Sequence, residues 1–245
     1  MTPVNNAFYD DLGDRWFEGG DHAIALLRAE TDLKLEYALE AFHEFGIESG
    51  ARVLDVACGG GLVSLPLAEK GFRVEGVDLS ESSLEVARSR ADGLDATFRV
   101  ADATNLDHGD GSVDAVLLFD VIEHVEDQRK LLAEATRVVR KGGIVLFNTF
   151  NQTPLSWLLA VHGFKFVTRE TPDHVHVWRL FVPPTTLGEW AALEGLEIVD
   201  IQGVRPRLGA PFWRSILRRR VDPEFAFTKT RSWAIGYMGL GIRRH

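Results

Sequence analysis

The stretch Val53-Leu54-Asp55-Val56-Ala57-Cys58-Gly59-Gly60-Gly61 decides the fold. It begins as a short apolar run containing one acid, which is typical of a buried strand in a parallel sheet. The glycines that follow let a ligand approach the backbone closely, at the edge of the sheet where such folds bind ligands. A tight strand-to-helix turn would use the same glycines, so the loop predicts a site only together with other signals.

Similar short apolar runs recur along the chain, separated by segments with helical periodicity. Strands are predicted at Arg52–Ala57, Arg73–Val77, Ala96–Val100, Val113–Phe119, Ile144–Thr149, Glu197–Gly203 and near Ala234–Arg243. Helices are predicted at Asp21–Phe45, Leu62–Glu69, Glu81–Arg90, Asp127–Arg140 and Thr185–Glu194. The alternation predicts an α/β fold with a Rossmann-like, doubly wound, seven-stranded and mostly parallel sheet. We expect one domain over residues 1–245, with an N-terminal helical region at 21–46 and an insertion after strand five at 151–181.

Acids after the first three strands indicate an adenosine cofactor. Asp78 ends the second strand, 23 positions after Asp55, where a carboxylate can accept hydrogen bonds from two ribose hydroxyls. Asp102 follows the third strand and could accept from an adenine amino group or cap a turn. Asp55 itself would repel a pyrophosphate, but it suits a ligand with a sulfonium and an ammonium group. S-adenosylmethionine is therefore the predicted cofactor, rather than a nicotinamide dinucleotide.

The segment after strand four carries the candidate chemistry. It reads Asp120-Val121-Ile122-Glu123-His124, and helical offsets would place the two acids and the imidazole on one side of a turn. Such a set predicts a site for Mg²⁺ or another divalent cation. Alternatively, His124 alone could take a proton from an acceptor hydroxyl, or the three side chains could only cap the next helix.

The chain resembles known methyltransferases in these segments. Val53–Gly61 is similar to motif I of class I S-adenosylmethionine-dependent methyltransferases, with Ala57 where that superfamily has its first glycine. Asn148–Trp157 and His176–Pro183 resemble two segments of the ubiquinone-biosynthesis O-methyltransferases. This resemblance implies Lys34, Ala57, Asp78 and Phe119 as cofactor contacts, beside Asp55, Gly59, Gly61 and Asp102 from the loop and the acids. It also implies Asp120, Glu123 and His124 as catalytic and metal-binding residues.

The resemblance implies methylation of a phenolic or catechol hydroxyl on a polyprenyl quinone precursor. Transfer to another small acceptor is the alternative. A cofactor-binding domain without activity also stays open, because Ala57 and Lys34 depart from the family pattern at the cofactor site. The partner expected in the main case is a small, lipophilic phenol.

The insertion has an apolar helical face. Leu155, Leu158, Leu159, His162 and Phe166 share one stripe, with cations near its end at Lys165 and at Arg169. This pattern predicts either an interfacial helix in peripheral contact with a membrane or a lid packed over the site.

Composition sets the remaining expectations. The net charge is −9, yet from Asp200 onward ten Lys/Arg face three Asp/Glu, or +7, which leaves −16 for residues 1–199. An acidic chain without a nucleic-acid motif is not expected to bind nucleic acid. With one cysteine and no leader-like or spanning apolar run, the chain is expected to be cytoplasmic, with peripheral contact at the inner membrane face.

Overall fold

The computed structural model describes residues 5–244; the predicted domain range of 1–245 also covers residues 1–4 and 245, which lie outside the described part. The strands are β1 Arg52–Val56, β2 Arg73–Asp78, β3 Ala96–Val100, β4 Val113–Phe119, β5 Val139–Phe150, β6 Leu196–Pro206, β7 Phe227–Thr230 and β8 Gly236–Arg243. The main helices are α1 Ile24–Glu44, α2 Ser64–Glu69, α3 Glu81–Ser89, α4 Gln128–Val138, α7 Pro184–Leu193 and α8 Ala210–Arg218. Short helical turns are η1 Asn6–Asp11, η2 Gly13–Trp16, η3 Ile122–His124 and η5 Trp178–Leu180.

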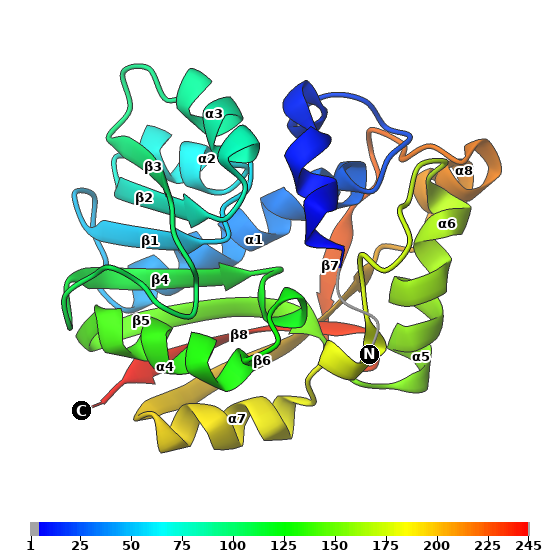
Figure 1. Cartoon of the computed structure of the whole chain (residues 1–245). Coiled ribbons are helices and arrows are strands. Elements are labelled where there is room, and N and C mark those ends of the chain that lie inside the picture. Colours follow the sequence, from blue (N-terminus) through cyan, green and yellow to red (C-terminus); the bar gives the residue numbers. More distant parts are fainter. Residues whose placement is uncertain (1–4, 245) are drawn as a thin grey trace.

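The strands form one sheet in the order β3-β2-β1-β4-β5-β8-β6-β7 (Figure 1). Strands β3 to β5 pair in parallel, whereas β8 is antiparallel to both β5 and β6. The winding reverses between β1 and β4, and in such sheets ligands bind outside the carboxyl ends of the strands at this reversal. The order of the strands therefore places the site beside the ends of β1 and β4.

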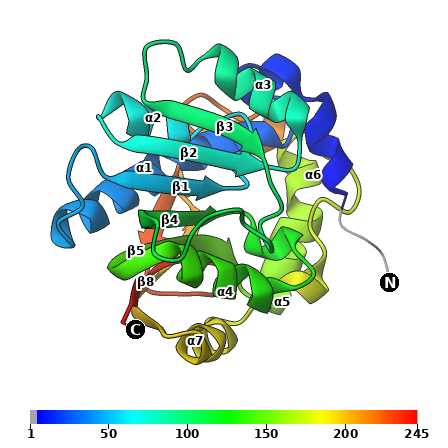
Figure 2. The same cartoon turned by 60° about the vertical axis from the view of Figure 1, so that its left-hand side comes forward.

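Helices cover both faces of the sheet (Figures 1 and 2). On one face, α1 and α2 pack through residues such as Phe42 and Leu67 against β1, β4 and β5. On the other face, α4 and α7 pack through residues such as Leu131 and Leu187. These two apolar layers hold the strand ends in place, because burying each large apolar side chain contributes about 1.5–3 kcal/mol.

The Rossmann-like, mostly parallel sheet is confirmed, but the predicted number of seven strands is one too low. The additional strand β7 is the four-residue segment Phe227–Thr230, paired antiparallel with β6 at the edge of the sheet. Its sequence Phe-Thr-Lys-Thr has no apolar run, because an edge strand is only partly buried and needs none.

The insertion forms a nearly continuous helix beyond β5. It runs through α5 Pro154–Ser156, the π-helical η4 Trp157–Gly163 and α6 Phe164–Val167. Thr153 caps its start, since Thr153 Oγ1 accepts a hydrogen bond from the Ser156 backbone. At its other end α6 contacts α8, and the two helices lie on the same side of the molecule (Figure 1). Among residues 5–244, no helix combines the length and apolar character that crossing a bilayer requires.

Candidate active site

A cavity of about 450 Å³ lies at the carboxyl ends of β1, β2 and β4. Of the predicted cofactor residues, Lys34, Asp55, Ala57, Gly59, Asp78, Asp102 and Phe119 line it. Phe119 is buried at the end of β4 and forms an apolar part of the wall. The cavity is within the usual size range of ligand sites.

The loop after β1 is shaped by positive φ angles. Ala57 has φ +60° and Gly59 has φ +52°, a region that costs a residue with a side chain about 1–2 kcal/mol. A Cβ atom on Gly59 would lie 2.3 Å from the Trp16 ring, so glycine is required for that ring to cover the loop. Gly61 is not part of the cavity wall. Its φ is +84°, and a Cβ atom there would crowd Ala87 and Leu65 at 3.2 Å, so Gly61 allows close packing behind the loop.

Asp55 and Asp78 bring two carboxylates to the cavity. Asp55 is buried and accepts a 2.5 Å hydrogen bond from Ser64 Oγ. Burial raises the pKa of Asp55 to about 7, although this hydrogen bond opposes the shift. Asp78 accepts from the backbone N–H groups of Gly59 at 2.8 Å and Ser80 at 2.9 Å, which fixes its carboxylate at the end of β2.

Asp102 serves the turn as well as the cavity. Its Oδ1 accepts from the Thr104 backbone at 2.8 Å and from Thr104 Oγ1 at 2.9 Å. Because Asp102 is exposed at the cavity edge, its second oxygen can still face a ligand. The turn cap and the adenine contact are therefore compatible.

Lys34 is buried under the cavity between two acids. Its ammonium contacts Glu30 at 3.2 Å and forms a shorter ion pair with Asp120. Burial alone would lower the pKa of Lys34, but the two carboxylates outweigh burial and raise it. Asn148 donates to Glu30 at 3.2 Å and so extends this network into β5. Lys34 is thus a fixed positive charge whose position depends on Asp120 and Glu30.

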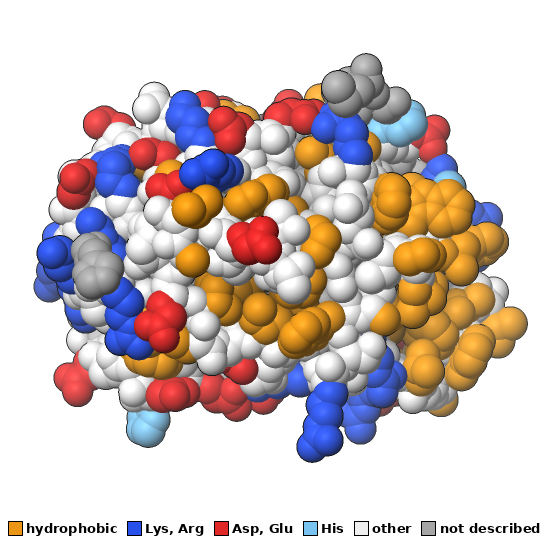
Figure 3. Space-filling view, turned by 90° about the horizontal axis from the view of Figure 1, so that it is seen from below, with side chains coloured by type: hydrophobic (Ala, Val, Ile, Leu, Met, Phe, Trp, Pro, Cys, Tyr) orange, Lys and Arg blue, Asp and Glu red, His pale blue; other side chains and the backbone are white. Residues whose placement is uncertain are grey.

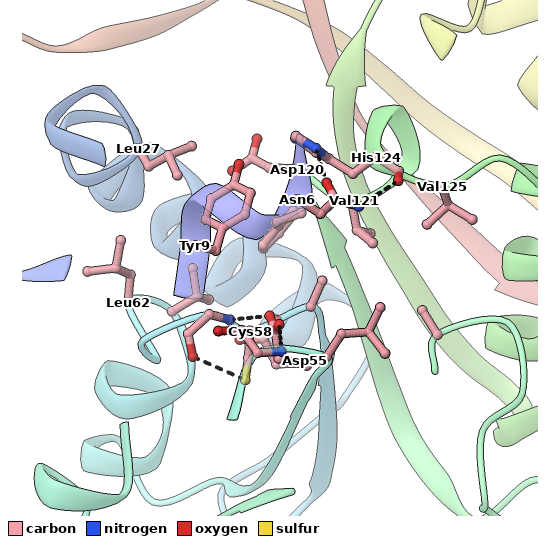
Figure 4. A pocket seen from close by; sticks show the side chains of 18 of the residues that line it. Asn6, Tyr9, Leu27, Asp55, Cys58, Leu62, Asp120, Val121, His124 and Val125 are labelled. Carbon is pink, nitrogen blue, oxygen red and sulfur yellow. Dashed lines mark hydrogen bonds between the residues drawn. The ribbon is translucent and has the colours of Figure 1, made fainter. Parts of the chain in front are cut away.

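The N-terminal segment forms a cover that the sequence pattern did not reveal. Trp16 Nε1 donates to Ser83 Oγ at 3.1 Å, and Tyr9 stacks on the Trp16 ring. Asn6 donates to the His124 carbonyl at 3.3 Å, and Figure 4 shows Asn6 and Tyr9 beside His124 and Asp120. The aromatic residues before α1 were the one feature of the sequence that could have indicated this cover. Their secondary structure was not predictable, because short helical turns of this kind show no clear periodicity.

Glu123 and His124 come together with His176 from the insertion. One potential ligand atom from each of these residues lies within 4.8 Å of the other two. Glu123 is fully buried; its Oε2 accepts from Thr149 Oγ1 at 2.7 Å, while Oε1 has no hydrogen-bond partner within the described part of the chain. Burial and the nearby charge of Asp120 raise the pKa of Glu123 to about 8.

Asp120 does not join this group. Its backbone is left-handed, with φ +54°, and the helical turn begins only at Ile122, so helical spacing does not extend to Asp120. Its carboxylate instead binds Lys34 and accepts from Asn148 at 3.4 Å. The predicted set of Asp120, Glu123 and His124 therefore does not fit one cation as a set in this arrangement.

A second cavity of about 560 Å³ adjoins the first. Tyr9, Leu27, Asp120 and His124 line both cavities. The wall of the second cavity is mainly apolar and comes from α1, the insertion helix, α8 and the end of β6. Its lining includes Leu26, Leu159, Ala160, Phe166, Val175, Val204, Phe212 and Phe225. A polar junction thus opens on one side to the acidic cavity and on the other to an apolar one.

Comparison with known proteins agrees with this arrangement. A family model described as "Methyltransferase domain" matches residues 54–147, from β1 to β5. The ubiquinone biosynthesis O-methyltransferase of Hahella chejuensis is 31% identical over 213 residues, covering 83% of this chain and 87% of that relative. The enzyme of the same name from Xanthomonas axonopodis pv. citri is 33% identical, covering 79% of this chain and 80% of the relative.

A solved structure with bound S-adenosylhomocysteine shares the fold. It is magnesium protoporphyrin IX methyltransferase from Synechocystis PCC 6803, with a TM-score of 0.66 and 18% identity, covering 97% of each chain. At 18% identity, this similarity shows a shared fold and nothing about the acceptor. Together with the sequence relatives and the acid-lined cavity, the comparison shows that the chain is an S-adenosylmethionine-dependent methyltransferase and belongs to the ubiquinone biosynthesis O-methyltransferase family.

Proposed function

We propose that the protein transfers the methyl group of S-adenosylmethionine to a phenolic or catechol hydroxyl on a polyprenyl quinone precursor, as in ubiquinone biosynthesis. The observation that carries this proposal is the apolar cavity that meets the cofactor cavity at His124 and Asp120. An acceptor with one polar ring and an apolar tail suits such a cavity, with its hydroxyl at the polar junction and its tail along the apolar wall. The relatives' printed names support the same acceptor class.

The chain's own residues would position both reactants. Asp78 would hold the ribose hydroxyls, and the ionised carboxylate of Asp55 would favour the positive charges of the cofactor. The N-terminal cover with Trp16 would exclude water from the transfer. Methyl transfer is a displacement in which the acceptor oxygen attacks the methyl carbon, so holding both groups in line supplies much of the rate.

The acceptor hydroxyl must lose its proton during the transfer, because a phenol has a pKa near 10. Burial lowers the pKa of His124 to about 3, so its imidazole is neutral and accepts a hydrogen bond but holds a proton weakly. His124 as the sole general base would therefore be inefficient. A divalent cation, when bound, would lower the pKa of the acceptor hydroxyl.

We also propose a peripheral membrane contact through the side of the molecule that carries the insertion and α8. Leu158, Phe166, Trp213 and Leu217 are exposed there, at 52%, 66%, 59% and 84%. Apolar side chains gather on this side in Figure 3. Arg218–Arg220, at the end of α8, add positive charge that suits anionic headgroups. A tail too long for the second cavity could leave it beside Phe166 and Trp213.

The acceptor class is tested by incubating the protein with labelled S-adenosylmethionine and matched alkyl catechol, alkyl phenol, alkyl aniline and alkyl thiophenol. The proposal expects O-methyl products from the phenolic compounds, identified by mass spectrometry. Label transferred to the aniline or thiophenol, with no O-methyl product, would favour the alternative of another small acceptor. No transfer to any acceptor, with the cofactor still bound, would contradict the proposal.

The membrane contact has a matched control. Phe166→Asp should weaken co-sedimentation with anionic liposomes, whereas Leu193→Asp should leave it unchanged. Both side chains are 66% exposed, but Leu193 lies on α7, away from the insertion. Equal binding of both variants and the wild type would favour a lid role for the insertion.

A further inference from the structure

We propose that Tyr9 is a catalytic residue, whose hydroxyl donates a hydrogen bond to the acceptor oxygen where the two cavities meet and so favours the ionised acceptor. The inference rests on the proposed function, because it needs an acceptor with an ionisable hydroxyl. Tyr9 lines both cavities, and Figure 4 shows its ring beside Asp120 and His124. Tyr9 therefore lies where the cofactor methyl group and the acceptor oxygen have to meet.

The ring of Tyr9 is held in place from several sides. It stacks on the Trp16 ring with the centroids 5.9 Å apart, and it meets the His124 ring edge-on at 5.8 Å. Ser83 Oγ donates to the Tyr9 carbonyl oxygen at 3.0 Å, which ties this turn to α3. The position of the ring is thus set before a ligand binds, and such fixed contacts orient reacting groups at little further entropic cost.

The hydroxyl of Tyr9 is available to a ligand. The other two tyrosines of the chain use their hydroxyls within the protein: Tyr37 donates to Asp200 Oδ2 at 2.7 Å, and Tyr237 donates to the Val182 carbonyl at 2.9 Å. Within residues 5–244, the hydroxyl of Tyr9 has no hydrogen-bond partner of this kind. Because Tyr9 is partly buried and faces both cavities, its hydroxyl can bond to a molecule bound there.

The other three side chains that line both cavities do not offer a donor. Leu27 is apolar, and the carboxylate of Asp120 only accepts hydrogen bonds. The amide nitrogen of Asn6 donates to the His124 carbonyl, so its Oδ1 is the atom that lies 3.2 Å from His124 Nδ1 and accepts from it. This leaves His124 Nε2 as an acceptor. Among these four shared side chains, Tyr9 carries the available donor.

A donor at this place assists the reaction because the acceptor must be ionised. Burial and the nearby carboxylates of Asp120 and Glu123 raise the pKa of Tyr9 well above its ordinary value, so its hydroxyl stays protonated. A hydrogen bond to the charged form of a group favours that form. It raises the ionised fraction of the acceptor more than it lowers the reactivity of each ion, since the oxygen keeps part of its charge in the transition state.

The step balances without a further reactant. The acceptor hydroxyl releases its proton to solvent, and the resulting phenolate oxygen forms a bond to the methyl carbon while the carbon–sulfur bond breaks. The electron pair of the broken bond stays on the sulfur, so an anion and a sulfonium cation give an ether and a thioether. Tyr9 keeps its proton throughout and acts only through the hydrogen bond.

The first test measures the ionisation of a bound acceptor analogue rather than turnover. An alkyl nitrophenol absorbs visible light strongly only as the phenolate, so a pH titration of its complex with the protein and S-adenosylhomocysteine gives the pKa of the bound hydroxyl. Tyr9→Phe keeps the ring and its stacking but removes the donor. We expect it to reduce the ionisation constant of the bound nitrophenol by roughly tenfold or more relative to the wild type.

Tyr37→Phe is the matched control for this titration. It also removes one tyrosine hydroxyl, but Tyr37 is not part of the wall of either cavity, so the pKa of the bound nitrophenol should equal that in the wild type. An equal pKa in Tyr9→Phe and the wild type would overturn the inference, and so would a wild type without saturable binding of the nitrophenol.

The second test compares kcat/KM for two acceptors at about pH 8, where an alkyl phenol is mostly protonated and an alkyl nitrophenol is mostly ionised. Tyr9→Phe should reduce kcat/KM by roughly tenfold or more for the phenol and much less for the nitrophenol, with cofactor affinity unchanged. Equal losses on both acceptors would indicate a structural role and overturn the inference. A shifted pKa of the bound nitrophenol without methyl transfer to any phenol would support the hydrogen bond while contradicting the proposed function.

Discussion

The two cavities that meet at His124 are built in different ways. The cofactor cavity is built from the ends of consecutive parallel strands and the loops after them. Backbone N–H groups fix the carboxylate of Asp78, and Ser64 Oγ fixes that of Asp55. The second cavity is assembled from α1, the insertion, α8 and β6, which are distant in the chain, and its wall is mainly apolar. The first cavity thus depends on charge and backbone conformation, and the second on apolar burial.

Under the proposed function, this difference separates the two tasks of the enzyme, which are to bind the cofactor and to bind the acceptor. A cofactor shared by many methyltransferases can be held by a local motif, because its charged groups meet fixed partners. An acceptor with a long apolar tail needs a large apolar surface rather than many polar contacts, and any set of packed helices can supply such a surface. Variants in one cavity should therefore change the binding of one reactant and leave the other nearly unaffected.

The largest effect is expected from Asp55→Asn, in the charged cavity. The folded pKa of about 7 lies above the unfolded value of about 3.9, so the stability that Asp55 contributes is complete below about pH 4 and is lost as pH rises through 7. The loss amounts to roughly 4 kcal/mol for the cofactor-free protein. Urea unfolding should show the free energy of unfolding of the variant rising relative to that of the wild type from about pH 4 to 7, and a constant difference above pH 8.

Cofactor affinity should respond to Asp55 in the opposite direction. The sulfonium and ammonium groups favour the ionised carboxylate, so the wild type should bind S-adenosylmethionine more tightly as pH rises from about 6 to 8. The variant should show a flat profile in the same calorimetric titrations. Parallel pH profiles in the two proteins would mean that Asp55 does not face the cofactor charge.

Asp78→Ala should reduce cofactor affinity by about 2–4 kcal/mol, or roughly thirtyfold to a thousandfold, because two ribose hydroxyls lose a charged acceptor. Asp95→Ala is a control at an exposed acid that pairs with Arg73 on the surface. Calorimetry measures cofactor affinity, and a labelled alkyl phenol measures binding in the second cavity. Unchanged cofactor affinity in Asp78→Ala would refute the assignment of this cavity.

Ala57→Gly is expected to have the smallest effect. Glycine adopts the φ of +60° without strain, so relief of strain should raise the free energy of unfolding by about 1 kcal/mol. The greater conformational entropy of glycine in the unfolded chain offsets part of this gain. Ala101→Gly, on the same cavity wall but without a positive φ, should lose stability instead. Thermal melts measure both variants. If the melting temperatures of both shifted in the same direction, backbone strain at Ala57 would be unimportant.

The sequence predicted the cofactor cavity better than the second one for a physical reason. Alternating strands and helices fix the sheet order, and this order brings Asp55, Asp78 and Phe119 to one edge without knowledge of side-chain contacts. The predicted helix in the insertion is also confirmed, because its periodicity is local.

Contacts between distant segments were not predictable. The left-handed backbone at Asp120 turned its carboxylate to Lys34, and no spacing rule reveals that conformation for an acid. His176 reaches Glu123 and His124 only through the path of the insertion. Trp16 covers the glycine loop across more than forty residues of chain.

The division between the cavities is tested most directly by kcat/KM for catechols carrying tails of increasing length. Each buried methylene is worth about 0.8 kcal/mol, so the first isoprene unit should raise kcat/KM at least about a hundredfold, with little further gain once the cavity is full. Ala160→Phe, which fills the apolar wall, should abolish most of this gain and leave cofactor affinity unchanged. A kcat/KM independent of tail length in the wild type would contradict an apolar acceptor site.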